Sequence, residues 1–190
     1  MSTSTSTKAL IGFLLAGTVG VIIFLFVHLS SDPGRPISIR SGKAAACTKG
    51  QKCLPEVSYT DTSGRVYGAK DLEGKVVIVN FWATWCKPCL KEIPDLSRVY
   101  EKYKDQGVII LGILTDNPDS SQLLNFQSDH DMSYPVVRSN SDIMVSFMYP
   151  ESLPTTFIYD RGGREVFSRV GAVSEQALAQ VLAPLVAQKR

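Results

Sequence analysis

The fold and the chemistry of this chain are decided by the stretch Val79-Asn80-Phe81-Trp82-Ala83-Thr84-Trp85-Cys86-Lys87-Pro88-Cys89. The apolar run Val76–Trp82 is rich in Val and Ile, which predicts a buried parallel strand. Apolar side chains then recur at helical spacing through Cys86–Gln106, which predicts a helix. The two cysteines are therefore expected at the junction between a strand and a helix.

Cys86 and Cys89 are three residues apart, so in the first turn of a helix they lie on one face. Sulfurs at this spacing can form a disulfide, for which the Cα atoms need to be ~5.5 Å apart. The free amides and the positive dipole end of the helix start, with Lys87 beside them, stabilise a thiolate and lower the pKa of Cys86. Pro88 costs no hydrogen bond in the first turn. Cys86 is therefore the expected nucleophile.

Other sites that contain two cysteines at this spacing have further requirements. Covalent haem attachment needs a histidine after the second cysteine, and this chain has Leu90. A four-thiolate zinc site would have to add Cys47 and Cys53, whose separation fits a zinc knuckle poorly. A copper carrier would usually add Met or His ligands, but the methionines that could serve are explained better by core packing. Zinc binding and copper carriage stay open as minor alternatives.

The rest of the sequence alternates between strand and helix patterns. The predicted elements are a hairpin of Glu56–Thr60 and Arg65–Tyr67, strands at Val108–Leu114 and Tyr134–Val137, helices at Ser120–His130 and Asp142–Tyr149, a hairpin of Thr155–Tyr159 and Glu165–Val170, and a final helix at Ser174–Ala187. This order predicts an α/β domain with a mixed central sheet and helices on both faces.

An uncharged apolar run of 19 residues, Ala9–Val27, lies near the N-terminus. As a helix it would extend roughly 28 Å, which just spans a bilayer core of ~30 Å. The residues after it form a poor cleavage site, so we expect an uncleaved transmembrane anchor at residues 9–29, after a short tail at residues 1–8. Residues 30–46 are rich in Ser, Gly, Pro and Ala and predict a tether, which leaves residues 47–190 for the domain.

Charge and cysteine content bear on the partners and the location. From residue 41 onward the chain has 17 basic and 17 acidic side chains, and this balance argues against nucleic acid as a partner. The basic residues after the apolar run favour a cytoplasmic domain by the positive-inside rule. Four cysteines in two close pairs suit an oxidising compartment better. We follow the cysteines and expect a catalytic domain outside the cytoplasm.

The stretch at residues 79–89, with Pro94 five residues on and Leu153-Pro154-Thr155-Thr156-Phe157 further along, resembles the active site of the thioredoxin superfamily. Within it, residues 54–187 most resemble the membrane-anchored, extracytoplasmic thiol:disulfide oxidoreductases of the TlpA, ResA and CcmG type. The resemblance implies a thioredoxin-like fold, no cofactor or metal, and reduction of protein disulfides, with an oxidase or isomerase as the alternative. Its implied partners are apocytochrome c or oxidase-assembly factors, and a membrane thiol relay as electron donor.

The resemblance also assigns residues to a substrate groove. Pro154 is implied to be a cis-proline that faces the disulfide, and Leu153 to line a groove in which a substrate chain pairs with backbone groups. Trp85, Lys87 and Pro88 are expected to border the same groove, with Trp85 limiting access to the disulfide.

Two positions, Asn80 and Glu92, set this chain apart from thioredoxin itself. Thioredoxin has a buried aspartate where this chain has Asn80, whereas the ResA-like subgroup resembles this chain in a glutamate three residues after the second cysteine, here Glu92. Helical spacing keeps Glu92 on the face of Cys89, where a partly buried carboxylate with a raised pKa could take the proton of Cys89. The alternative is a solvated helix glutamate beside Lys91.

Cys47 and Cys53 lie outside the superfamily motif. A bridge between them would close a small loop and pin the tether to the first strand of the domain, so we expect a structural disulfide. A second redox pair that exchanges electrons with Cys86 and Cys89 is the sharper alternative, and free thiols are the third.

Overall fold

The structure is a computed structural model that describes residues 21, 24, 47–48 and 50–188. The chain divides into two units, Met1–Arg40 and Ser41–Arg190. The predicted anchor at residues 9–29 and the predicted tether at residues 30–46 lie outside the described residues, apart from two helical positions. Within the described part, no helix has both the length and the apolar character needed to cross a membrane.

Five strands form the central sheet of the domain, in the order β5-β4-β3-β6-β7. They are β3 (Val76–Trp82), β4 (Val108–Leu114), β5 (Val136–Arg138), β6 (Thr155–Tyr159) and β7 (Glu165–Val170). The middle strand β3 is parallel to β4 and antiparallel to β6, and all of its residues are buried. A continuous run of Val and Ile suits such a strand because both of its faces are covered. The mixed sheet and the bounds of β3, β4, β6 and β7 are confirmed.

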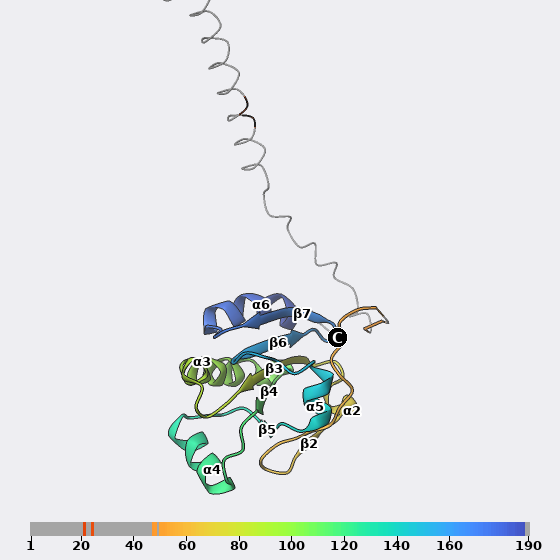
Figure 1. Ribbon diagram of the computed structural model, residues 1–190. Coiled ribbons are helices and arrows are strands. Elements are labelled where there is room, and N and C mark those ends of the chain that lie inside the picture. Colours follow the sequence, from red (N-terminus) through yellow and green to blue (C-terminus); the bar gives the residue numbers. More distant parts are fainter. Residues whose placement is uncertain (1–20, 22–23, 25–46, 49, 189–190) are drawn as a thin grey trace, which may run out of the picture. The chain divides into compact units, whose positions relative to one another are not determined.

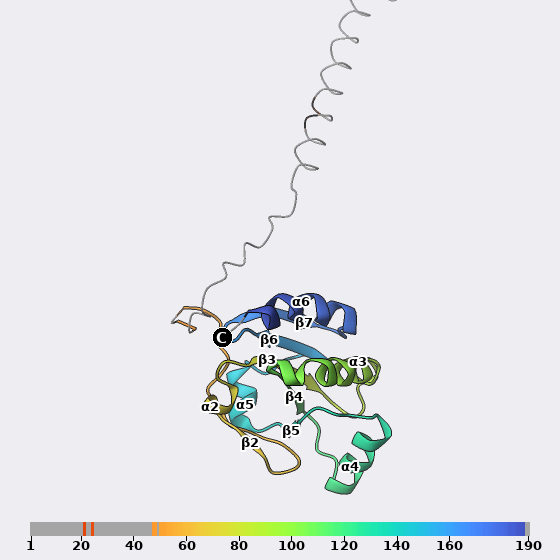
Figure 2. The same ribbon diagram turned by 180° about the vertical axis from the view of Figure 1, so that it is seen from behind.

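Helices cover both faces of the sheet, as Figures 1 and 2 show from opposite sides. They are α2 (Ala69–Leu72), α3 (Lys87–Tyr103), α4 (Ser120–Asp129), α5 (Ser141–Ser146) and α6 (Glu175–Ala187), with the 3-10 turn η1 (Lys104–Gln106) after α3. On one face, Leu96 of α3 and Leu182 of α6 pack on Ile78. On the other face, Phe147 after α5 meets Phe81 of β3 with ring centroids 5.0 Å apart. The predicted layer arrangement is confirmed.

The first hairpin and the edge strand differ from their predicted bounds. The hairpin strands β1 (Tyr59–Thr60) and β2 (Val66–Tyr67) begin three residues and one residue later than predicted, and both end where predicted. The single turn α2 was not predicted, and Asp71 holds its start by accepting the N–H of Gly68 at 2.9 Å. β5 begins two residues later than predicted, because Pro135 has no N–H for a sheet ladder.

Several predicted helix ends fall on residues that cap the helices. Cys86 is the N-cap of α3 and His130 the C-cap of α4, so each lies one residue outside the helix that was predicted to contain it. Ser174 is the N-cap of α6, in agreement with its expected role as the serine cap of the final helix. The helix α5 ends earlier than predicted because Met148 and Tyr149 have φ angles of 56° and 50°. These angles lie in the left-handed region, which a right-handed helix cannot continue through.

Candidate active site

Cys86 and Cys89 lie at the start of α3, just beyond the end of β3. The sulfur of Cys86 accepts a hydrogen bond from the backbone N–H of Cys89 at 3.3 Å. The two sulfurs form a disulfide with their Cα atoms 5.2 Å apart. Cys86 is 3% exposed and Cys89 is fully buried, whereas Lys87 and Pro88 between them are exposed. The predicted placement at a junction of strand and helix is confirmed, and Cys86 is the slightly more exposed of the two cysteines.

The loop between β3 and α3 is held by the segment that follows β4. The carbonyl of Trp82 accepts the backbone N–H of Thr115 at 2.9 Å and its hydroxyl at 3.0 Å. The carboxylate of Asp116 accepts the backbone N–H and the hydroxyl of Thr84. Trp85 comes next and is 70% exposed, so the loop holds an indole at the surface directly before the reactive pair. Sequence reasoning missed Asp116, because no local pattern signals a contact with a distant loop.

The peptide bond between Leu153 and Pro154 is cis, as the resemblance implied. Leu153 packs against the apolar cluster that contains Cys86 and Cys89, so this predicted groove residue lies on the same cluster as the reactive pair. The carbonyl of Pro154 accepts the backbone N–H of Gly171 at 2.8 Å, which ties the start of β6 to the end of β7. The start of α3, the start of β6 and the end of β7 therefore lie at the same end of the sheet.

Glu92 is buried on the inner face of α3, with an exposed fraction of 1%, which contradicts the alternative of a solvated helix residue. One carboxylate oxygen accepts a hydrogen bond from Nδ2 of Asn80 at 2.7 Å, and the other accepts the backbone N–H of Val173 at 2.9 Å. Burial raises the pKa of Glu92 to about 7 despite these two hydrogen bonds, which lower it, and the charge of Asp95 adds to the rise. Glu92 can therefore take up and release a proton near neutral pH.

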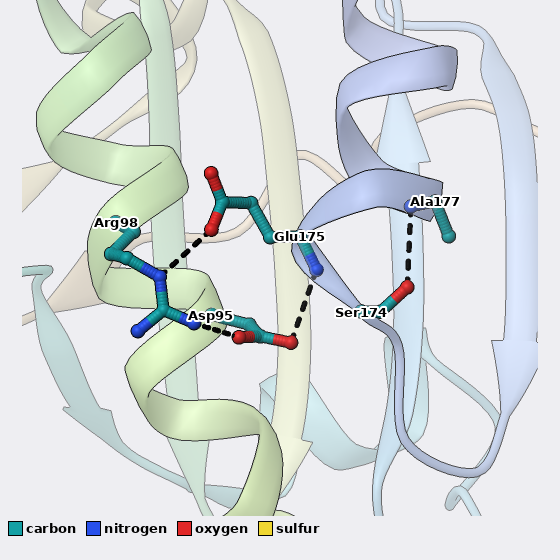
Figure 3. A network of polar contacts seen from close by, with 5 residues as sticks. All are labelled: Asp95, Arg98, Ser174, Glu175 and Ala177. Carbon is teal, nitrogen blue, oxygen red and sulfur yellow. Dashed lines mark hydrogen bonds and ion pairs between the residues drawn. The ribbon is translucent and has the colours of Figure 1, made fainter.

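A second carboxylate of α3 holds the start of α6, as Figure 3 shows. Asp95 accepts the backbone N–H of Glu175 at 3.1 Å. Arg98 forms ion pairs with the carboxylates of Asp95 and Glu175. Ser174 caps the first turn of α6. These contacts fix the start of α6. They thereby also fix the position of Val173, whose backbone N–H donates to Glu92.

Comparisons with known proteins agree with this geometry. The model of the AhpC/TSA family matches residues 50–166. The chain belongs to the AhpC/TSA family of thioredoxin-like proteins. Among curated relatives, the thiol-disulfide oxidoreductase ResA of Bacillus cereus is 34% identical to this chain over 175 residues, which cover 92% of each protein.

Solved structures share the fold of this AhpC/TSA protein. A thioredoxin-family thiol:disulfide interchange protein from Chlorobium tepidum is 27% identical, with a TM-score of 0.66 over 74% of this chain and 100% of that chain. A secreted thiol-disulfide isomerase from Corynebacterium glutamicum is 26% identical, with a TM-score of 0.62 over 70% of this chain and 84% of that chain. The resemblance stated from the sequence is confirmed, and this AhpC/TSA protein is a thiol-disulfide oxidoreductase.

The second disulfide of this AhpC/TSA protein joins Cys47 to Cys53. It is attached to the turn between β6 and β7, where the N–H of Cys47 donates to the carbonyl of Gly162 at 2.9 Å and Cys53 forms a β-bridge with Arg164. The predicted attachment to the first strand of the domain is wrong. The reason is that β1 pairs with β2, whereas the backbone of the turn supplies partners for the segment around Cys53.

The two disulfides lie at opposite ends of the sheet. The ladder between β3 and β6 runs from the pair Val77 and Tyr159 to the pair Phe81 and Thr155. Cys53 lies beyond the first end and the active-site pair beyond the second, and the strand between them extends roughly 13 Å. Thiol-disulfide exchange requires one sulfur to attack another directly. The four ligands of a zinc site must all contact the same ion. The geometry therefore excludes direct exchange between the pairs and a zinc site made from all four cysteines.

Replacing both Cys47 and Cys53 with serine is expected to lower the free energy of unfolding by about 2 kcal/mol, because the bridge closes a small loop of the unfolded chain. The rate of disulfide exchange is expected to stay unchanged, because the bridge lies far from Cys86. Denaturant unfolding and an exchange assay on the full-length variant measure the two quantities. A large loss of exchange rate with little change in stability would give this pair a redox role instead.

Proposed function

We propose that this protein reduces disulfides in other proteins, with Cys86 as the attacking thiolate and Cys89 as the resolving thiol. The observation that carries this proposal is the position of Cys86 as the N-cap of α3, where the N–H of Cys89 already points at its sulfur. Such N–H groups and the helix dipole stabilise a thiolate. Lys87 adds a positive charge beside it. Because Cys89 is fully buried, a large disulfide substrate meets Cys86 first.

The reaction balances in two steps. In the first, the Cys86 thiolate attacks one sulfur of the substrate disulfide, forms a mixed disulfide and releases the other substrate sulfur as a thiolate. In the second, Cys89 loses its proton, attacks the sulfur of Cys86 and releases the remaining substrate thiolate. Two electrons pass from the dithiol to the substrate. The disulfide between Cys86 and Cys89 in the structure corresponds to the oxidised end of this sequence.

Glu92 is the acceptor that we propose for the proton of Cys89. The two residues are three positions apart on α3, which places them on one side of the helix, and both are buried. A general base is most effective when its pKa lies near the operating pH. Burial raises the pKa of Glu92 to about 7, which meets this condition.

The substrate groove of this proposal is bordered by Trp85, Lys87, Pro88, Leu153 and Pro154. The contact of Leu153 with the cluster around the cysteines and the exposure of Trp85 support this assignment. An exposed indole gives a large, rigid apolar surface on which a substrate chain can pack.

The dithiol form of the full-length chain, purified in detergent, is expected to reduce the disulfides of insulin much faster than its Cys86→Ser variant does. The variant without Cys47 and Cys53 is the matched control and should react at the parent rate. Appearance of insulin thiols measures the reaction. A protein that holds copper tightly and leaves insulin oxidised would be a metal carrier rather than a reductase.

We further propose that residues 9–29 anchor the protein in a bacterial cytoplasmic membrane, with the catalytic domain on the periplasmic or outer side. The uncharged apolar run supports an anchor, and two disulfides in one domain support an oxidising compartment. The structural neighbour from Corynebacterium glutamicum is a secreted protein. In this setting apocytochrome c is the proposed substrate, a membrane thiol relay is the proposed electron donor, and lipid surrounds the anchor.

Alkaline phosphatase fused after Lys43 is expected to be active in cells, because that reporter needs oxidised cysteines and the proposed topology exports it. A cytoplasmic reporter fused at the same residue is the matched control and should be inactive. Enzyme activity per amount of fusion protein is the measurement. The reverse pattern would place the domain in the cytoplasm, in accord with the basic residues Arg35, Arg40 and Lys43 after the apolar run.

A further inference from the structure

Asn80 lies in the middle of β3 and is fully buried. Its Nδ2 donates to Oε1 of Glu92 at 2.7 Å and to the hydroxyl oxygen of Thr156 at 3.0 Å. Its Oδ1 has no hydrogen-bond partner among the described residues. Buried polar atoms are normally paired, so an unpaired oxygen on a side chain whose amide can rotate calls for an explanation.

The contacts of Glu92 suit its ionised form best. Each of its two oxygens faces an N–H donor, one from Asn80 and one from the backbone of Val173. An ionised carboxylate accepts at both oxygens, but a protonated carboxyl group carries an O–H, which is a donor. Protonation therefore turns one of the two oxygens into a poor acceptor and adds an O–H that needs an acceptor of its own. The backbone N–H of Val173 is fixed by the start of α6, so only Asn80 can change its orientation.

We propose that the side-chain amide of Asn80 rotates by about half a turn when Glu92 takes up a proton, so that Asn80 serves both protonation states of Glu92. After rotation, Oδ1 of Asn80 accepts the O–H of Glu92. The hydroxyl of Thr156, which can turn about its C–O bond, donates to the same oxygen. The oxygen that is unpaired beside the carboxylate thus gains two donors beside the carboxylic acid, while Nδ2 gives up its two acceptors on Glu92 and Thr156.

This role explains why an amide suits the position better than the carboxylate that thioredoxin has there. An aspartate at residue 80 would place a second carboxylate against Glu92, and neither group could donate until one of them took a proton. Asn80 is a positioning residue, since it acts through Glu92. Its effect on catalysis rests on the proposed function of Glu92 as proton acceptor, whereas the rotation requires only that Glu92 titrates.

The ionisable groups that act on Glu92 or belong to the elements beside it are Cys86 at the N-cap of α3, Cys89 and Asp95 on α3, Tyr134 before β5, the exposed Arg169 on β7 and Glu175 on α6. In the oxidised protein the two cysteines form a disulfide and do not titrate. Asp95 and Glu175 are both paired with Arg98, and burial raises the pKa of Tyr134. Glu92 is therefore the group whose titration near neutral pH should act on Asn80.

Nuclear magnetic resonance of the oxidised full-length chain in detergent micelles tests the rotation. The cross-peak between the Nδ2 protons of Asn80 and the side-chain protons of Thr156 is expected at high pH and should be lost at low pH. The midpoint of this loss should coincide with the titration of the carboxyl carbon of Glu92. Asn140, whose Oδ1 accepts the N–H of Ile143 at 2.9 Å to cap α5, is the internal control and should keep its orientation throughout.

Glu92→Gln gives a second, independent readout. The N–H of Val173 needs the amide oxygen of the new side chain, which leaves the amide nitrogen to donate to Oδ1 of Asn80. This variant should therefore lack the cross-peak to Thr156 at every pH. Any of three results would overturn the proposal. The cross-peak could persist in the parent while Glu92 titrates, Glu92 could fail to titrate between pH 5 and 9, or the cross-peak could be retained in the variant. If the rotation is observed but Glu92→Gln resolves mixed disulfides at the parent rate, the rotation stands and the acceptor role fails.

Discussion

Cys89→Ser is expected to convert almost all of the reacting protein into a stable mixed disulfide between Cys86 and its substrate. A serine hydroxyl cannot attack the sulfur of Cys86 to release the substrate, so the first step occurs and the second does not. Non-reducing electrophoresis with oxidised insulin measures the adduct. The same variant, produced in the source cells, should retain its natural substrates for mass spectrometry.

Cys86→Ser is the matched control, because it keeps the second sulfur but removes the accessible one. It should form no adduct, and its exchange rate should fall to that of the uncatalysed reaction, since Cys89 is fully buried. Comparable adducts from the two variants would mean that either cysteine can attack, and the buried position of Cys89 would then not determine its role.

Glu92→Gln is expected to slow the resolution of the mixed disulfide by roughly 10²-fold or more, the usual contribution of a general base. The attack by Cys86 should change far less, because it does not need this carboxylate. In the parent, resolution should speed up as the pH rises toward about 7, where Glu92 loses its proton, and this dependence should vanish in the variant. Single-turnover reduction, followed from pH 6 to 8, separates the two steps. Equal resolution rates for variant and parent across that range would remove Glu92 from the mechanism.

The stability of the same variant provides a check that does not involve catalysis. The pKa of Glu92 is raised from 4.5 to about 7 in the folded protein, so the folded state binds this proton more tightly than the unfolded state does. The free energy of unfolding of the parent should therefore fall as the pH rises from about 4.5 to about 7, and then level off. Glu92→Gln should lack this fall, as denaturant unfolding of the oxidised protein at several pH values would show. An unchanged slope would mean that Glu92 is not the group with the raised pKa.

The elements that the sequence predicted correctly are those whose burial appears in a local pattern. β3 and β4 are runs of apolar residues interrupted only by Asn80 and Gly112, so their bounds follow from composition. The single turn α2 has no such pattern, because four residues are too few for helical spacing to show. The end of α5 depends on the left-handed backbone of Met148 and Tyr149, and neither residue type signals that conformation.

The candidate site likewise has features that the sequence could predict and features that it could not. The spacing of Cys86, Cys89 and Glu92 along one helix places them on one face, and this could be predicted. Their partners come from other elements: Asn80 from the middle strand, and the N–H of Val173 from the loop before α6. Spacing within one helix gives the direction of a side chain but not what that side chain meets. The attachment of the second disulfide to the turn after β6 was beyond prediction for the same reason.

The division of roles between the two cysteines is tested most directly by mapping the early mixed disulfide of the unaltered protein. The reduced full-length chain is mixed with one equivalent of a disulfide peptide and quenched with acid within the first turnover, and the products are digested and sequenced by mass spectrometry. The peptide is expected on Cys86 alone, with Cys89 still a free thiol. A peptide attached to Cys89, or found equally on both cysteines, would contradict the assignment of Cys86 as the attacking thiolate.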